Sequence, residues 1–178
     1  HGLSVSIIGK TDVGLTTMTE VMIAAKNISN SIDIPTIIDA DTGYGGPINV
    51  IRTIQEAEQA GVAGIQLEDQ IWPKKCGHME GKRIISTSKM ENKIKAAADN
   101  RKTDLVIIAR TDAAAISGIE EAVNRSNKYL EAGADVAFID APESKEDLIK
   151  EDKQVKGPVL ANMTESGKTP LLNAKELE

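Results

Sequence analysis

Five runs of apolar residues recur along the chain without the polar alternation of a half-exposed strand. They lie within residues 35–41, 58–69, 104–112, 130–143 and 157–165. Strands with apolar residues on both sides are buried on both faces, as in the parallel sheet of an α/β protein. Because the intervening segments are long enough for a crossover helix, the pattern predicts alternating strands and helices.

The helix boundaries have their own signals. Thr17 and Glu20 have the spacing of a capping box. Ser117 is predicted to precede a helix that carries acids in its first turn. Gly61 and Gly133 each follow a helical stretch and precede an apolar run, a position where glycine ends a helix in the left-handed conformation. The segments around these two glycines resemble each other, which predicts a repeated helix-and-strand unit.

Polar residues follow every predicted strand. They are Asp39 and Asp41, Glu68 and Asp69, Arg110 and Asp112, Glu143, and Asn162 with Thr164. In an eight-stranded barrel the carboxyl ends of all strands surround one site, whereas an open doubly wound sheet carries a phosphate loop at its switch point. Since no phosphate-loop motif follows any run, the sequence predicts an α/β fold of the (β/α)8 TIM-barrel type.

Five strands do not close such a barrel, whose usual length is roughly 250 residues. The chain has 178 residues, begins without methionine and ends within a helix signal at residues 173–178. We therefore expect residues 1–178 to form a single partial TIM-barrel domain that lacks the terminal strands at both ends.

Composition restricts the partners. The chain is 40% hydrophobic and 27% charged, as in a soluble globular protein. It has 27 acidic against 21 basic residues and no basic cluster, so no nucleic-acid partner is expected. No apolar run has membrane-spanning length and the start has no signal-peptide pattern. Together with the single cysteine, these features predict a cytoplasmic protein without a membrane partner.

Asp39, Asp41 and Glu68 are candidate ligands of a divalent cation. Three carboxylates around one point repel each other unless a metal lies among them, and oxygen ligands suit Mg²⁺. The alternative is that Asp39 and Asp41 cap a glycine-rich turn, which is the commoner role of an isolated Asp-x-Asp. The presence of polar residues at all five strand ends favours the metal site.

The only cysteine, Cys76, stands in the sequence KKCGH at residues 74–78. A lone cysteine is more often a small buried apolar residue, but no apolar periodicity surrounds this one. Two lysines and a histidine would lower the thiol pKa, so we expect a nucleophile or proton donor on a mobile loop. Zinc is disfavoured because no second cysteine exists and His1 is terminal. Capping of the loop explains His78 equally well.

Arg110 has two interpretations. A guanidinium at a strand end either pairs with neighbouring carboxylates in a structural ion pair or binds an anionic substrate, and spacing does not separate the two. Together with a metal and Asn162, it would suit a small di- or tricarboxylate.

The motifs DADTGYG, LEDQ, PKKCGHMEGK, ARTDA, APES and ANMTESGKTP occur in this order. In them the chain resembles the isocitrate lyase and phosphoenolpyruvate mutase superfamily over almost its entire length, most closely the methylisocitrate lyase branch. The most specific element is KKCGH, because the carbon–carbon lyases keep this cysteine while the mutases have a different gating loop.

The resemblance implies a barrel whose last helix is swapped between neighbours, a homotetramer, and bound Mg²⁺ with Mn²⁺ as a substitute. The implied metal site has Asp39 and Asp41 as ligands, with Glu68 and Asp12 holding metal-bound water. Cys76 is implied to be the catalytic acid, and His78 and Glu68 are counted with it as catalytic. The residues implied to bind substrate are Cys76, Gly77, Arg110, Glu143, Asn162 and Thr164.

The implied reaction is a retro-Claisen cleavage in which a 2-hydroxyl group loses its proton, a carbon–carbon bond breaks and the thiol protonates the departing carbanion. For this chain we expect a Mg²⁺-dependent lyase that converts a 2-methylisocitrate-like substrate to pyruvate and succinate. The alternatives are a relative that cleaves oxaloacetate or dimethylmalate, and a carboxyvinyl-carboxyphosphonate phosphorylmutase, against which Cys76 argues. A third is a fragment that folds only within an assembly and has no activity of its own.

Parts of the family pattern are missing. A substrate-binding Ser-Gly loop would precede residue 1 and further arginines would follow residue 178, so the chain does not contain a full site. Ser166 stands where methylisocitrate lyases are expected to have an aromatic residue, and a bulky residue expected near Ala141 is also missing. These departures leave the alkyl groups of the substrate open.

Overall fold

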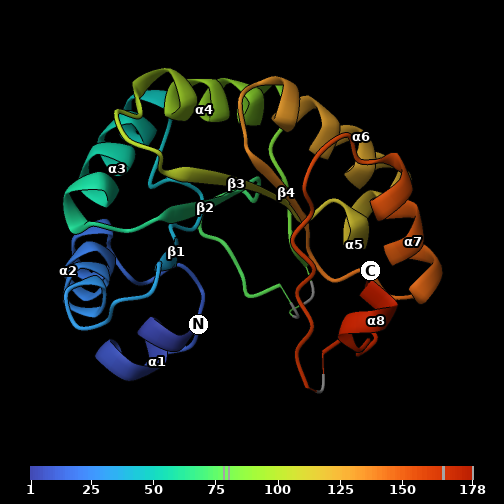
Figure 1. The fold of residues 1–178 in the computed structure, drawn as a ribbon, viewed down its shortest axis with the longest axis horizontal. Coiled ribbons are helices and arrows are strands. Elements are labelled where there is room, and N and C mark those ends of the chain that lie inside the picture. The colour runs from blue at the N-terminus through green and yellow to red at the C-terminus, as the bar shows by residue number, and fades with distance from the viewer. Residues whose placement is uncertain (78, 80, 166, 178) are drawn as a thin grey trace.

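A parallel sheet lies at the centre of the fold, with helices along its outer side (Figure 1). The computed structural model describes residues 1–77, 79, 81–165 and 167–177. In this part of the chain each strand pairs in parallel with the next, in the order β1-β2-β3-β4. The strands are β1 (Ile37–Asp39), β2 (Gly64–Glu68), β3 (Val106–Thr111) and β4 (Val136–Ile139).

The helices form an arc around the sheet. Their bounds are α1 (Gly2–Ile8), α2 (Met18–Ser29), α3 (Pro47–Ala60), α4 (Thr87–Asn100), α5 (Ala114–Ser117), α6 (Ile119–Glu131), α7 (Lys145–Gln154) and α8 (Ala174–Leu177). In Figure 1, α2, α3, α4, α6 and α7 follow one another around the outside. The arrangement is the arc of a barrel that the sequence predicts. Among the described helices, none is both long enough and apolar enough to cross a bilayer.

The fifth predicted strand lies beside β4 but is only partly formed. Its backbone makes an isolated parallel bridge between Val159 and Ala137. Ala137 donates to Pro158 and accepts from Leu160, both at 2.9 Å. Because Pro158 has no N–H group, this segment begins with a residue that cannot donate to a neighbouring strand. Four full strands and one bridge therefore stand where five strands are predicted.

Two of the helix signals are confirmed. The hydroxyl of Thr17 accepts from the Glu20 backbone N–H at 3.3 Å, and the Glu20 carboxylate accepts from the Thr17 N–H at 2.8 Å. Gly61 ends α3 in the left-handed conformation with φ 75°. The capping box thus sets the start of α2, and Gly61 sets the end of α3. These two helices precede and follow β1 in the chain.

The start of α6 differs from the prediction. Ser117 does not cap this helix but ends the short helix α5, and α6 begins at Ile119 after Gly118. Gly118 has φ 86° and ψ 169°, which a residue with a side chain rarely adopts. The glycine therefore separates α5 from α6 and moves the predicted start of α6 by one residue.

The main core lies between the sheet and the helices. Its largest fully buried side chains include Ile54 of α3, Ile65 and Leu67 of β2, Ile94 of α4, and Ile107 of β3. Both faces of β2 are covered, since four of its five residues are buried. This double burial explains the continuous apolar pattern of the strands.

A buried carboxyl in α7 makes the stability depend on pH. Glu151 is 2% exposed, and burial raises its pKa to about 7, although a hydrogen bond from the Ile139 backbone opposes the shift. The folded state keeps this proton up to about pH 7, whereas the unfolded chain releases it near 4.5. Stability therefore falls as the pH rises through this interval, by about 3 kcal/mol in total.

Glu151→Gln is expected to remove this dependence, because the amide stays neutral at every pH. Urea denaturation should find the variant about as stable as wild type at pH 4.5 and roughly 2–3 kcal/mol more stable at pH 8. Glu146→Gln, an exposed position in the first turn of the same helix, is the control. Equal pH dependence in Glu151→Gln and wild type would contradict the assignment.

Candidate active site

A cavity of about 450 Å³ opens at the carboxyl ends of the strands. Seven of the predicted site residues line it: Asp12, Asp39, Cys76, Gly77, Arg110, Asn162 and Thr164. Its other lining residues are His1, Lys74, Asp140 and Glu165. Segments far apart in the sequence therefore meet at the edge where a parallel barrel places its site.

Three other predicted site residues do not line this cavity. Asp41 and Glu68 are buried, with 6% and 0% exposure. Glu143 is exposed, and its carboxylate pairs with Lys168 at 3.0 Å. His78 lies outside the described residues. Asp41 and Glu68 are thus set back from the cavity, whereas Glu143 forms an ion pair at the surface.

Lys74 links the acids of two segments. Its Nζ lies 2.7 Å from Asp12 Oδ1 and 2.8 Å from Asp41 Oδ1, and the side chain is 3% exposed. Burial alone would lower its pKa, but the carboxylates of Asp39 and Asp41 raise the pKa above the ordinary value for lysine. Lys74 is therefore a fixed positive charge. Sequence reasoning treated it only as a neighbour of the thiol.

The predicted metal ligands have unused oxygens. Asp41 Oδ2 and both carboxylate oxygens of Glu68 are buried and accept no hydrogen bond from a described residue. Burial raises the pKa of both carboxyls, and Lys74 and Arg110 oppose the shift in Asp41 and Glu68 respectively. Buried carboxylate oxygens that accept no hydrogen bond are the kind of ligand that a hard cation such as Mg²⁺ prefers.

These carboxylates fit Mg²⁺ by chemistry, although they do not converge on one point. Within the described ranges, the grouped ligand atoms belong instead to His1, Asp12 and Cys76. Lys74 already binds one oxygen each of Asp12 and Asp41, which leaves Asp41 Oδ2 for a cation. The exposed Asp39 accepts from the Asp41 N–H at 2.9 Å, so the two aspartates form a turn as well as a candidate site.

Arg110 is held by acids at the carboxyl ends of three strands. Its Nε and Nη2 lie 3.0 Å from the two oxygens of Asp112. Nη2 also lies 3.2 Å from Asp140, and Nε lies 3.4 Å from Glu68. The guanidinium also lies over the ring of Phe138, 5.3 Å from its centroid. Arg110 therefore does form the structural ion pairs with neighbouring carboxylates that were one of its two interpretations.

Arg110 also keeps one nitrogen available for an anion. The nitrogen Nη1 takes part in none of the ion pairs that Arg110 makes with described residues, and Arg110 lines the cavity. Lys82 adds a second cation, since its Nζ lies 2.8 Å from Asp112 and 3.1 Å from Asp140. Burial would raise the pKa of Asp112, but Arg110 and Lys82 lower it below the ordinary value. Asp112 therefore stays charged and orients the guanidinium.

The loop that carries Cys76 contacts this ion-pair cluster directly. A Cβ atom at Gly77 would lie 2.3 Å from Asp140 Oδ2 and 2.8 Å from Arg110 Nη2. On the other side of the cysteine, the Cys76 backbone N–H donates to the Asp12 carbonyl at 3.1 Å. The loop thus places the Cys76 thiol between the Asp12 segment and the guanidinium of Arg110.

A buried network supports the ends of β2 and β3. Asp69 accepts hydrogen bonds from Thr111 Oγ1 at 2.7 Å, the Asp112 backbone N–H at 3.0 Å and Tyr129 OH at 2.8 Å. Arg125 of α6 lies 3.1 Å from the same carboxylate. Asp69 therefore fixes the backbone of Asp112, whose side chain orients Arg110.

Tyr129→Phe is expected to destabilise the protein by about 1–3 kcal/mol, because it leaves a buried carboxylate short of a donor. Tyr44 is the matched control, since its hydroxyl is buried but makes no hydrogen bond to a described residue. Tyr44→Phe should change the free energy of unfolding little or raise it. Urea denaturation of both variants checks the prediction, and equal effects would contradict it.

This chain is similar to known proteins over all or nearly all of its length. The family model described as phosphoenolpyruvate phosphomutase matches residues 1–178. The 2,3-dimethylmalate lyase of Eubacterium barkeri is 52% identical over 179 residues, which cover 100% of this chain and 62% of that protein. A probable 2-methylisocitrate lyase of Corynebacterium glutamicum is 49% identical over 94% of this chain and 55% of that protein. The chain therefore spans about 55–62% of the length of these relatives.

Solved structures superimpose closely. A crystal structure of 2,3-dimethylmalate lyase has a TM-score of 0.95 at 41% identity, covering 98% of this chain and 60% of that one. Oxaloacetate acetylhydrolase with 3,3-difluorooxalacetate has a TM-score of 0.94 at 37% identity, and the match covers 98% of this chain and 61% of that one. Phosphoenolpyruvate phosphomutase from Streptomyces platensis superimposes with a TM-score of 0.81 at 30% identity, and the match covers 85% of this chain and 55% of that one. These superpositions confirm the predicted α/β barrel type, of which this chain forms a part.

Proposed function

We propose that this chain, which belongs to the phosphoenolpyruvate mutase and isocitrate lyase superfamily, provides most of the active site of a carbon–carbon lyase acting on a 2-hydroxy carboxylate. The observation that carries the proposal is the cavity in which a thiol, a guanidinium and carboxylates meet. The relatives named as lyases support the same reaction class.

The substrate we propose first is a 2-methylisocitrate-like tricarboxylate. Arg110 Nη1 would hold one of its carboxylates, and Asn162 and Thr164 on the opposite segment would bind another polar group. The branch of 2,3-dimethylmalate lyases is the second candidate, because the Eubacterium barkeri relative is 52% identical. Both substrates release pyruvate and differ in the second product.

The reaction breaks the bond between C2 and C3 of the substrate. The 2-hydroxyl group loses its proton to a base, its oxygen becomes the carbonyl of pyruvate, and the electron pair of the broken bond moves to C3. The Cys76 thiol then gives its proton to C3 and becomes a thiolate, which is reprotonated before the next turnover. Arg110 would hold a carboxylate of the substrate near the reacting atoms. Lys74 would hold the carboxylates of Asp12 and Asp41 beside them.

A magnesium ion would lie among Asp39, Asp41, Glu68 and Asp12. When bound, it would orient the 2-hydroxy carboxylate and neutralise charge that develops on the oxygen. Lys74 shares this work, because it neutralises part of the charge of Asp12 and Asp41 without leaving its buried position.

A phosphonate mutase reaction is the less favoured alternative. Transfer of a phosphoryl group within one molecule needs no proton at carbon, so the thiol of Cys76 would have no role. The position of Cys76 at the cavity, next to Arg110 and Asp12, therefore supports the lyase.

The experiment supplies 2-methylisocitrate and 2,3-dimethylmalate to the full protein with Mg²⁺. Pyruvate is measured by coupled reduction, and NMR identifies succinate or propionate as the second product. We expect pyruvate with succinate from the first substrate. Turnover of a phosphonate without pyruvate from either acid would rule out the lyase.

The helix swap, the homotetramer and the single-domain limits remain predictions, for which light scattering and a structure of the assembly are the tests.

Asp39→Ala is expected to weaken Mg²⁺ binding by about tenfold or more, as the loss of groups at a metal site commonly does. Titration calorimetry measures the affinity, and Asp33→Ala, an exposed aspartate before β1, is the control. Unchanged affinity in Asp39→Ala would mean that the aspartates only shape the turn after β1.

A further inference from the structure

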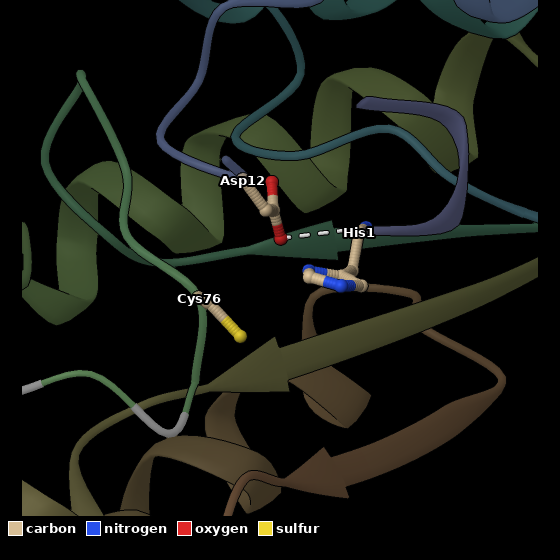
Figure 2. Close-up of side chains that lie close together, drawn as sticks. All are labelled: His1, Asp12 and Cys76. Carbon is tan, nitrogen blue, oxygen red and sulfur yellow. Dashed lines mark ion pairs between the residues drawn. The ribbon is translucent and has the colours of Figure 1, made fainter. Parts of the chain in front are cut away.

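Three side chains of different chemistry meet at the mouth of the cavity. Figure 2 shows His1, Asp12 and Cys76 pointing toward one another. They come from the start of the chain, from the loop after α1 and from the loop after β2. One ligand atom from each lies within 4.8 Å of the other two. An imidazole, a carboxylate and a thiol are all able to bind a metal ion.

The spacing of these atoms is close to that of a metal site. With metal–ligand bonds of about 2.0–2.3 Å, two ligands of a tetrahedral zinc ion lie about 3.5 Å apart. Atoms within 4.8 Å of one another therefore reach a common ion after side-chain shifts on the order of 1 Å. His1 is exposed and Cys76 is half-buried, so both have room for such shifts.

Asp12 is already oriented for this role. Its Oδ1 is bound by Lys74 at 2.7 Å, and Figure 2 shows the carboxylate directed toward His1. One oxygen is thus held in place while the other is directed toward His1. Lys74 would also offset part of the negative charge that a thiolate and a carboxylate bring to the ion.

We infer that His1, Asp12 and Cys76 form a regulatory site for a divalent transition-metal ion such as Zn²⁺. The mixed sulfur, nitrogen and oxygen ligands suit zinc or cobalt, whereas Mg²⁺ prefers oxygen alone. The sequence disfavours zinc because no second cysteine exists and His1 is terminal, but the fold brings a carboxylate and the His1 imidazole to the thiol. Three protein ligands leave the fourth position to water or a substrate carboxylate.

Binding at this site would stop the lyase, and this part of the inference rests on the proposed function. When Cys76 binds the ion, a sulfur–metal bond replaces the sulfur–hydrogen bond and the proton passes to solvent. No electron is transferred. The thiolate then has no proton to give to the departing carbanion, so turnover ends until the ion dissociates.

Cobalt titration of the untagged full chain tests the site without any activity measurement. Co²⁺ bound to a thiolate gives a charge-transfer absorption in the near ultraviolet, and competition by Zn²⁺ gives the zinc affinity. We expect the absorption in wild type and in the control Asp104→Asn, an exposed aspartate before β3. Cys76→Ser should lose it, and His1→Ala should bind about tenfold to hundredfold more weakly.

A matching activity series tests the regulation. Each variant is compared with its own activity in Mg²⁺ alone, so that only the zinc effect is scored. The concentration of Zn²⁺ that halves activity should rise in His1→Ala by the same factor as the dissociation constant. Equal affinity in His1→Ala and wild type, or a spectrum without the sulfur band, overturns the site. The band without zinc inhibition of an active enzyme overturns the regulation, and the band without any lyase activity overturns the proposed function alone.

Discussion

Replacing Cys76 with serine is expected to lower kcat of the proposed lyase reaction by about 10²–10⁴-fold, the usual contribution of a positioned proton donor. The serine hydroxyl occupies the same place but releases its proton far less readily. KM should change little, because Arg110 and the opposite segment at Asn162 still bind the substrate. Steady-state pyruvate release with Mg²⁺ measures both constants.

The fate of the proton distinguishes a donor from a merely structural thiol. In D₂O, wild type should place one deuterium on the former C3 with a single configuration. In Cys76→Ser, residual product should carry deuterium in both configurations, because water then reaches the carbon from either side. A variant with nearly unchanged kcat and a single configuration would show that another group delivers the proton.

Arg110→Met is expected to destabilise the protein by about 3–5 kcal/mol, since removal of one partner leaves buried charges without compensation. Asp112, Asp140 and Glu68 would lose the cation between them, although Lys82 still contacts two of these acids. Urea denaturation measures the effect. Arg52→Met is the control, because Arg52 pairs with Glu56 at the surface and is worth about 0–1 kcal/mol.

Arg110→Lys separates binding from stability. A lysine keeps the positive charge but cannot grip Asp112 with two nitrogens and still present a third to a substrate. KM should therefore rise by about tenfold or more while most of the stability returns. If Arg110→Met is as stable as Arg52→Met, the acids around position 110 do not depend on the guanidinium.

Much of the fold follows from local patterns in the sequence. The strands β1 to β4 lie within continuous apolar runs, and the caps at Thr17 and Gly61 set the ends of neighbouring helices as predicted. Such signals are readable because they depend on residues close together in the chain. The start of α6 was placed one residue early and the short helix α5 was missed, because only the backbone angles of Gly118 show where one helix ends and the next begins.

The site was predictable in its residue types but not in its contacts. The family resemblance named Asp12, Cys76 and Arg110 as site residues, and all three line one cavity in the structure. Nothing in local spacing says that Lys74 would turn toward Asp12 and Asp41 rather than toward the thiol, because that depends on long-range packing. The same limit applies to the meeting of His1 with Cys76.

The tight approach of Gly77 to Asp140 and Arg110 has an evolutionary consequence. Since a side chain at position 77 would have to displace the Asp140 carboxylate and the Arg110 guanidinium, a mutation there would disturb the ion pairs instead of only reshaping the wall of the cavity. A lineage that shifts to a longer or shorter acid must change residues elsewhere. The exposed segment with Asn162 and Glu165 is the side with room for such change, and diversity among enzymes of this kind should concentrate there.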